Sequence, residues 1–204
     1  MKFLLVMVIA YVAGSVNFSI ILFRLLGRDD PRKSFSGNAG TTNVYRLAGP
    51  HWAALVLLLD VGRAVAVALL AVKVLAAGQA PWAGLALVAG NRFPCFHRFE
   101  GGKGVANYLG FTAVITPVGA VLSCAAWVLV YPVSRAPFIA SFAMVAVLSI
   151  ATMVVSGFTP GAVIGAALTA LFIILNHGKN ITAWFGKMNR EEGEDEDEDH
   201  LTKD

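Results

Sequence analysis

The chain has 204 residues, of which 57% are hydrophobic and 14% are charged. With a mean hydropathy of +0.68, this composition excludes an ordinary water-soluble domain. We therefore expect an all-α integral membrane protein whose surroundings are membrane lipids, with no nucleic acid among its partners.

Apolar segments recur along the whole chain and predict about seven transmembrane helices. They lie near 3–26, 52–77, 80–96, 104–115, 117–133, 137–155 and 160–177. Several have the roughly 20 residues that a bilayer requires, whereas the fourth is short, the fifth is a second candidate for a short segment, and both could be broken or tilted. Only Lys2 precedes the first segment and no small-residue cleavage site follows it. We therefore expect a retained helix and not a removed signal peptide.

The placement of Lys and Arg predicts the topology. If the chain crosses seven times, the loops after the first, third, fifth and seventh helices share one face. That face carries Arg28, Arg32, Lys33, Arg46, Arg98, Lys103, Arg135, Lys179, Lys187 and Arg190. The opposite face holds little more than Lys2 and Lys73. The positive-inside rule then puts the N-terminus outside and the C-terminus in the cytoplasm.

The C-terminal end differs sharply in composition from the rest of the chain. Residues 191–199 carry eight of the 13 acidic residues. Such a run has no apolar face to bury, so we predict one transmembrane domain over 1–190 and a disordered, solvated tail over 191–204. Cys95 and Cys124 show no disulfide framework and no metal-ligand spacing, and we predict neither a metal nor a cofactor.

The loop after the first helix is too long for a simple connection. Between Asp30 and Arg46 it offers hydroxyls, amides and open backbone, together with arginines that can hold phosphate in a bidentate fork. The candidate ligands in this loop are Arg32, Ser36, Gly37, Asn38, Gly40, Thr42, Asn43 and Arg46. A turn-rich linker whose arginines extend to the lipid headgroups is the alternative.

A glycine-rich segment surrounds Lys103 between two apolar segments. Gly101, Gly102 and Gly104 lack the Cβ atoms that would keep an anion from the backbone N–H groups, and Lys103 adds a compact positive charge. These residues predict a phosphate cradle at the membrane surface, although a tight turn between two helices would look similar. The segment is not a Walker loop, because Gly104 stands where Ser or Thr would follow the lysine.

Further polar residues fall in or beside the apolar segments. Asp60 and Arg63 share a helix face and should pair or line a polar cavity, because charges at membrane depth are costly. Whether such a pair is structural or functional stays open. Ser141, His177 and Asn180 follow the fifth and seventh helices, on the same predicted face as the two polar loops. Convergence of these elements predicts a ligand site at that face.

Taken together, the motifs resemble the bacterial acyl-phosphate:glycerol-3-phosphate acyltransferases, the PlsY family, over nearly the whole chain to about residue 187. Gly14-Ser15 with Phe18 is similar to the family's GS-x-x-F, and residues 30–43 to its D-x-R-x-x-G-S-G-N-x-G-A-T-N. Residues 90–106 resemble G-H-x-F-P-x-F-x-x-F-x-G-G-K-G-V-A. Asp60 with Arg63, Arg135 with Ser141, and His177 with Asn180 resemble the family's D-x-x-K-G, R-x6-S and H-x-x-N.

The resemblance implies a seven-helix fold in the bacterial cytoplasmic (inner) membrane. It also implies transfer of a fatty acyl group from acyl phosphate to the 1-position of glycerol 3-phosphate, which yields lysophosphatidic acid and phosphate. By analogy the catalytic residues are Ser36, Lys103, His177 and Asn180. The substrate-binding residues are Asn38, Thr42, Asn43, Arg46, Asn91, Gly101, Gly102, Gly104 and Ser141.

Four departures from the family pattern involve five positions. Asn91 replaces a His, Phe35 replaces a Gly, Arg63-Ala64 replaces Lys-Gly, and Asn17 replaces a Pro. An Asn cannot titrate near neutral pH, so any proton transfer by that His would be lost. One alternative is therefore an impaired homologue that binds a phosphorylated ligand in a regulatory role. An organic-phosphate transporter is a further alternative, although the polar residues cluster at one face and not at the membrane midplane.

Overall fold

The computed structural model describes residues 1–35 and 37–186, so Ser36 and the predicted tail at 191–204 lie outside the described residues. The described chain is helical. Its helices are α1 (Lys2–Gly14), α2 (Phe18–Leu25), the short 3-10 helix η1 (Pro31–Lys33), α3 (Thr41–Ala48), α4 (Pro50–Val74), α5 (Ala80–Arg92), α6 (Val105–Ile115), α7 (Pro117–Ser134), α8 (Pro137–Val155) and α9 (Pro160–Leu175). A further helix, Gly178–Gly186, follows α9 at an angle of 48°.

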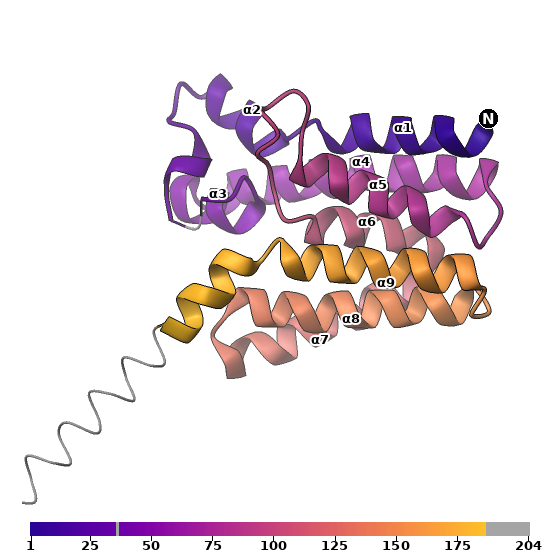
Figure 1. Ribbon diagram of the computed structural model, residues 1–204. Helices are drawn as coiled ribbons and strands as arrows, with labels where there is room; N and C mark the ends of the chain where they lie inside the picture. Colours follow the sequence, from indigo (N-terminus) through magenta and orange to yellow (C-terminus); the bar gives the residue numbers. More distant parts are fainter. Residues whose placement is uncertain (36, 187–204) are drawn as a thin grey trace, which may run out of the picture.

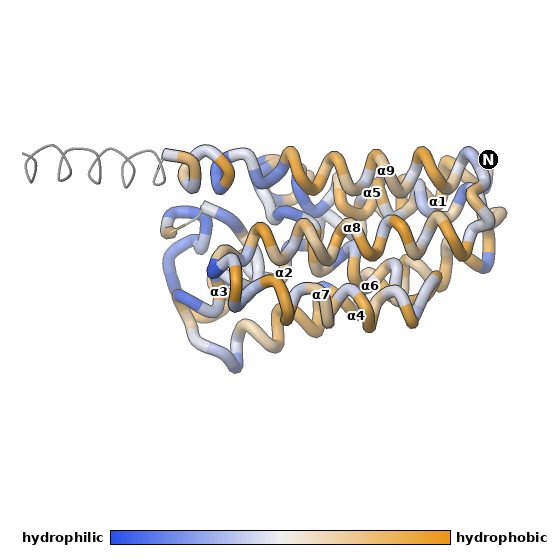
Figure 2. Tube along the Cα trace, turned by 90° about the horizontal axis from the view of Figure 1, so that it is seen from below, coloured by the Kyte–Doolittle hydropathy of each residue, from blue (hydrophilic) through white to orange (hydrophobic). Residues whose placement is uncertain are grey.

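The longer helices lie side by side, and the chain passes back and forth between two ends of the bundle (Figure 1). α7 packs on α8, α4 on α6, and α1 on α5. The N-terminus lies at one end, and α2, α3 and the helix after α9 lie at the other. Most hydrophilic segments gather at this second end (Figure 2). We call it the polar end; it brings together loops that are far apart in the sequence.

Helix lengths support fewer membrane spans than the seven predicted. Four segments are long and apolar enough to cross: Lys2–Leu25, Pro50–Val74, Pro117–Ser134 and Pro137–Val155. The bent pair formed by α9 and the helix after it makes a fifth. α5 and α6 have 13 and 11 residues. At 1.5 Å per residue they reach only about 20 Å and 16 Å, short of a hydrocarbon core of about 30 Å. The predicted shortness of the fourth segment is confirmed.

The first span is broken, and Arg63 of α4 bridges the break. α2 begins where the side chain of Asn17 caps it by accepting a backbone hydrogen bond of 3.1 Å. Nη1 of Arg63 donates to the carbonyl of Val16 in the break, while Nη2 lies 2.9 Å from Oδ1 of Asp60 and 2.5 Å from Oδ1 of Asn107. The predicted pairing of Asp60 with Arg63 is confirmed. The pair also satisfies backbone carbonyls that the broken helix leaves without partners.

The segment from Asp30 to Arg46, predicted as a loop, is more ordered than expected. It contains η1 and α3, so the prediction was wrong for its second half. Nδ2 of the buried Asn43 donates to the carbonyls of Pro31 at 2.6 Å and Ser34 at 3.2 Å. These bonds tie α3 to η1, and side-chain bonds of this kind to distant backbone leave no periodic signal in the sequence.

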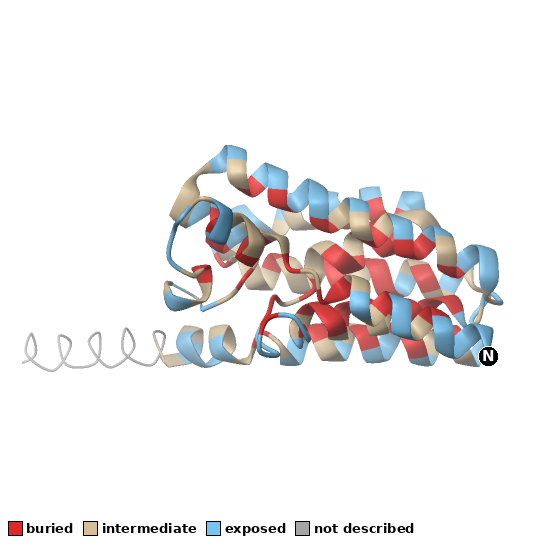
Figure 3. Ribbon diagram, turned by 90° about the horizontal axis from the view of Figure 1, so that it is seen from above, coloured by how far each residue is buried: buried red, intermediate tan, exposed pale blue. Residues whose placement is uncertain are grey.

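α5 is enclosed on most sides (Figure 3) and fixes the position of the loop that follows it. A Cβ atom at Gly90 would lie 2.0 Å from the carbonyl oxygen of Tyr11, so only glycine permits this close approach of α5 to α1. The hydroxyl of Tyr11 donates to the carbonyl of Phe93 at 2.7 Å. α5 ends at Arg92 because Phe93 precedes Pro94, which disfavours helical backbone.

Candidate active site

A cavity of about 700 Å³ opens among the polar-end loops and helices α4, α6, α7 and α8. Most of the predicted site residues line it: Asn38, Thr42, Arg46, Asn91, Gly102, Lys103, Gly104, Ser141, His177 and Asn180. Of the other predicted residues, Asn43 and Gly101 are not among its lining, and Ser36 lies outside the described residues. The loops after α2, α5 and α9 and the start of α8 therefore meet at one place.

Lys103 is at the centre of the polar part of this cavity. Its Nζ donates to Oδ1 of Asn180, and its carbonyl accepts from Nδ2 of Asn176 at 3.4 Å. Burial and, to a lesser extent, the nearby cations Arg46 and Arg92 together lower the pKa of Lys103 to about 8. Positive charge gathered in a partly enclosed space favours the binding of an anion, which would in turn restore the ordinary basicity of the lysine.

The glycines around Lys103 fold its loop tightly against the end of α5. The backbone N–H of Gly102 donates to the carbonyl of Asn91 at 2.9 Å, and a Cβ atom at Gly102 would lie 2.6 Å from Nδ2 of the same residue. Gly101 is similarly constrained, since its Cβ would lie 2.0 Å from the Asn91 carbonyl oxygen. Gly104 adopts φ of +94°, which suits glycine, and begins α6. Gly101 therefore has a packing role, while Gly102 and Gly104 border the cavity.

Arg46 lies on α3 beside Phe35, one of the positions that departs from the family pattern. Its guanidinium carbon is 5.9 Å from the centre of the Phe35 ring, within the range of a cation–π contact. Phe35 has φ of +51°, a left-handed backbone that costs a non-glycine residue roughly 1–2 kcal/mol. The backbone at position 35 thus has the conformation that a glycine would adopt without strain, and its side chain is 68% exposed.

His177 lies at the turn after α9 and is only 3% exposed. Its Nδ1 is 2.7 Å from the carbonyl oxygen of Ile173, and the edge of Phe142 packs on the ring with 5.2 Å between centroids. Because a carbonyl can only accept, Nδ1 carries the proton in this bond. The neutral ring therefore keeps a lone pair on Nε2. Ser141 donates its hydroxyl to the carbonyl of Pro137 at 2.8 Å, which leaves its oxygen as an acceptor.

Several lining residues were not among the predicted ones. Asp60 and Asn107 border the polar part, where both contact Arg63. A polar residue inside an otherwise apolar helix was the available signal for Asn107. The remaining wall is apolar and could not be separated from ordinary lipid-facing or core positions by sequence. It is formed by Leu57, Leu109, Cys124, Trp127, Val128, Tyr131, Phe138 and Met144.

The cavity therefore has two chemically different parts. One part offers cations, amides, hydroxyl oxygens and a histidine, and the other offers aliphatic and aromatic surface. Trp127 and Tyr131 stack on one another along α7 at 4.8 Å between ring centroids. A ligand that fills both parts must combine an anionic or hydroxylated head with an apolar tail.

Comparison with known proteins gives one consistent family. Residues 4–187 match the family model for glycerol-3-phosphate acyltransferase. A glycerol-3-phosphate acyltransferase of Pseudomonas fluorescens strain Pf-5 is 38% identical over 189 residues, which cover 92% of this chain and 98% of the relative.

Solved structures agree with the sequence comparison. The crystal structure of PlsY (YgiH), an integral membrane glycerol 3-phosphate acyltransferase, in its glycerol 3-phosphate form has a TM-score of 0.84 and 31% identity, covering 92% of this chain and 94% of that one. The same enzyme in its lysophosphatidic acid form has a TM-score of 0.82 and 31% identity, covering 92% and 93%.

Proposed function

This chain belongs to the glycerol-3-phosphate acyltransferase family, and on that premise we propose that it transfers a fatty acyl group from acyl phosphate to the 1-position of glycerol 3-phosphate. The products are lysophosphatidic acid and inorganic phosphate. The observation that carries the proposal is the two-part cavity, because a single space lined by cations and apolar side chains suits both the amphiphilic donor and the amphiphilic product.

In this proposal the polar part holds the phosphate groups and the glycerol. Lys103 and Arg46 bind phosphate, since an ammonium and a guanidinium form the strongest hydrogen bonds to anionic oxygens. His177, Asn180 and Ser36 complete the catalytic group. The glycerol hydroxyls and the remaining phosphate oxygens are bound by Asn38, Thr42, Asn91, Gly102, Gly104 and Ser141. Asn43 and Gly101 instead support the loops that carry these residues.

The reaction needs no acylated side chain. The 1-hydroxyl oxygen of glycerol 3-phosphate attacks the acyl carbonyl carbon, a carbon–oxygen ester bond forms, and the bond from that carbon to the phosphate oxygen breaks. The departing phosphate takes up the hydroxyl proton. An acyl phosphate is already activated, so the protein contributes alignment of the two substrates and stabilisation of the negative charge that develops. Nε2 of His177 can accept a hydrogen bond from the attacking hydroxyl and orient it.

The apolar part then receives the acyl chain. Trp127 and Tyr131 on α7 and Phe138 on α8 form a wall beside the polar part. α7 also carries exposed apolar side chains, such as Leu129, that would face lipid. A chain held between α7 and α8 could therefore enter and leave sideways through the bilayer, while the soluble acceptor enters from the polar end.

The chain is an all-helical integral membrane protein, and we extend this to a topology. The basic loops and the cavity share the polar end, which by the positive-inside rule faces the bacterial cytoplasm, with the N-terminus outside. Glycerol 3-phosphate would then reach the cavity from the cytoplasm. Seven crossings remain our proposal if α5 and α6 cross a locally thinned or tilted region. Residues 1–190 would form the one domain, followed by a solvated acidic tail.

One assay separates catalysis from mere binding. Purified protein receives palmitoyl phosphate and glycerol 3-phosphate, and both phosphate release and lysophosphatidic acid are quantified. We expect the two products in equal amounts, with formation dependent on both substrates. Binding of glycerol 3-phosphate without turnover would instead identify a regulatory homologue impaired by Asn91 and Phe35. Phosphate release without the lipid product would mean hydrolysis of the donor.

A further inference from the structure

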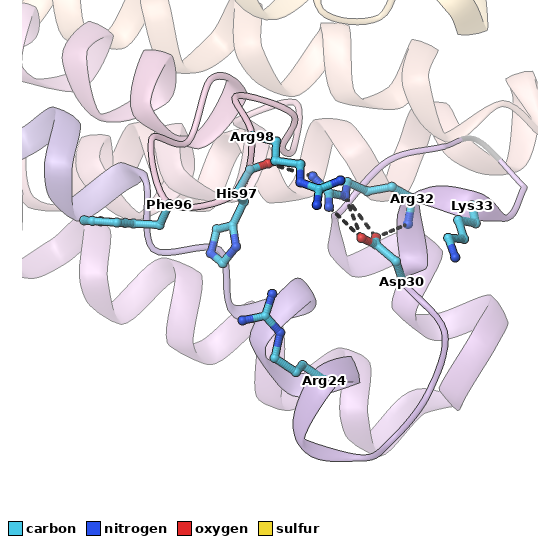
Figure 4. A pocket seen from close by; sticks show the side chains of 7 residues that line it. All are labelled: Arg24, Asp30, Arg32, Lys33, Phe96, His97 and Arg98. Carbon is cyan, nitrogen blue, oxygen red and sulfur yellow. Dashed lines mark hydrogen bonds and ion pairs between the residues drawn. The ribbon is translucent and has the colours of Figure 1, made fainter.

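A second pocket, of about 330 Å³, lies between the loop after α2 and the loop after α5 (Figure 4). It shares no lining residue with the catalytic cavity. Four cationic side chains line it, Arg24, Arg32, Lys33 and Arg98, but only one carboxylate, that of Asp30. So large an excess of positive charge around one pocket needs a physical explanation.

The single carboxylate is already fully engaged. Oδ1 of Asp30 accepts from the backbone N–H and Nε of Arg32, both at 2.9 Å, and Oδ2 accepts from Nη2 at 2.5 Å. Nη1 of Arg32 donates to the carbonyls of His97 at 2.9 Å and Glu100 at 2.7 Å. Asp30 and Arg32 therefore hold the two loops together, and one carboxylate that is paired with Arg32 and also near Lys33 cannot neutralise all four cations.

The three cations other than Arg32 have no partner of their own within residues 1–35 and 37–186. Arg24, Lys33 and Arg98 make no hydrogen bond or ion pair there through their side chains. Arg24 extends from the last turn of α2 toward the ring of His97 (Figure 4). Because all three are exposed, they are available to a ligand without loss of any internal contact.

His97 supplies a second, independent sign of a ligand. It is 8% exposed, lines the pocket, and its ring nitrogens have no hydrogen-bond partner among the described residues. Burial, together with Arg24 and Arg32, lowers the pKa of His97, so the ring is neutral at pH 7 and has one N–H to donate. The ring nitrogens are not themselves enclosed by protein, so they are open to a ligand in the pocket.

Exposed apolar side chains accompany the cations of this pocket. Phe96 lines it and is 59% exposed, and Leu25, next to Arg24, is 79% exposed. Exposed aromatic and aliphatic side chains beside arginines are typical of the level of lipid headgroups. We propose that this pocket binds the phosphate group of an anionic membrane phospholipid, with Arg24, Arg98, Lys33 and the N–H of His97 as donors and Phe96 against the acyl chains.

The test measures lipid binding to delipidated protein in neutral detergent. Phosphatidylglycerol is titrated and its binding is followed by native mass spectrometry, beside diacylglycerol and inorganic phosphate as separate arms. We expect one phosphatidylglycerol to be retained and diacylglycerol not to be. Inorganic phosphate should displace the lipid only weakly. Tight binding of phosphate that phosphatidylglycerol cannot reverse, and that Arg24→Gln with Arg98→Asn abolishes, would overturn the lipid as the ligand of this pocket.

Two double variants test whether phosphatidylglycerol binds at this pocket. Arg24→Gln combined with Arg98→Asn should weaken phosphatidylglycerol binding about tenfold, since two charge-assisted contacts are lost. Asn suits position 98, whose φ is +59°. Arg135→Gln with Lys179→Gln removes the same charge from exposed sites outside the pocket and should retain binding. Equal loss in both double variants would show non-specific attraction and overturn the proposal.

A third variant separates this pocket from the catalytic cavity. Lys103→Ala should bind phosphatidylglycerol like the parent, because Lys103 lines only the catalytic cavity. If Lys103→Ala abolishes lipid binding, the lipid occupies that cavity and the second pocket is not its site. Lipid binding at this pocket is independent of acyl transfer, so a chain without transferase activity would still show it.

Discussion

The ammonium of Lys103 donates to the side-chain oxygen of Asn180, although the two residues are 77 positions apart. The contact joins the glycine-rich loop after α5 to the helix that follows α9. Asn180 therefore holds Lys103 in place while it leaves the positive charge uncompensated, because an amide oxygen accepts a hydrogen bond without neutralising its donor. A carboxylate at position 180 would compete with the substrate phosphate for the same ammonium.

Lys103→Ala should reduce kcat/KM for acyl transfer about ten- to a hundredfold. Loss of one charge-assisted contact to phosphate corresponds to roughly 1.5–3 kcal/mol of binding or transition-state stabilisation. Lys73→Ala is the matched control, because Lys73 is exposed near the end of α4 and lines neither pocket. If Lys103→Ala folds normally and turns over like the parent, the glycine-rich segment is only a turn and the site assignment fails.

The pH dependence of acyl transfer should follow the protonation state of Lys103. With its pKa lowered to about 8, Lys103 is an ammonium below that pH and a neutral amine above it. Since kcat/KM follows the free enzyme, the value for glycerol 3-phosphate should fall as the pH rises through about 8. Lys103→Arg, whose guanidinium stays charged above pH 12, should move this fall to higher pH. If kcat/KM of the arginine variant decreases over the same pH range as that of the parent, the decrease belongs to another titrating group.

Much of the site could be predicted from residue type and spacing. Lys103, Arg46, His177 and Asn180 were found because polar residues between apolar segments must face water, a partner or a ligand. Because loops at the same end of a helix bundle lie close to one another, these residues were expected to converge. The break in the first span at Val16 could not be predicted from the sequence. It depends on the side chain of Arg63, on another helix, which donates to the Val16 carbonyl.

The limits of the predictions have physical causes. Asn38 and Asn43 lie in the same polar segment, and the sequence does not say which of them faces a ligand. In the structure Asn43, on α3, is buried against η1, whereas Asn38 lines the cavity. Helix α3 was missed because it has only eight residues, and the packing of its few apolar side chains, such as Val44 and Leu47, on α4 stabilises it. The acyl-chain wall was missed for the opposite reason, since Trp127 looks like any other apolar residue of a membrane helix.

The proposed topology predicts which residues a membrane-impermeant thiol reagent reaches. In a background with Cys95 and Cys124 replaced, cysteines at Arg28 and Gln79 should label from opposite sides, with Arg28 on the cytoplasmic side. The reason is that α4 runs the length of the bundle between these two positions. Labelling of both from the same side of sealed, oriented vesicles would exclude a crossing by α4, and labelling of position 28 from the periplasmic side would exclude the N-out arrangement.

Position 35 offers a test of how the loop before α3 affects the cavity. Phe35→Gly should relieve about 1 kcal/mol of strain from the left-handed backbone, while it also removes the ring beside Arg46. Phe35→Ala removes the same ring but keeps the strained φ. The free energy of unfolding should therefore be higher for the glycine variant than for the alanine variant by about 1 kcal/mol.

The same pair of variants separates the two ways in which Phe35 can act on catalysis. If the ring restrains Arg46, both variants should raise KM for glycerol 3-phosphate by a similar factor, about two- to fivefold for an exposed cation–π contact of 0.5–1 kcal/mol. If the backbone matters more, only the glycine variant should differ from the parent, because alanine keeps the left-handed backbone of Phe35. Two variants with unchanged KM and equal stability would show that this departure from the family pattern has no consequence for the site.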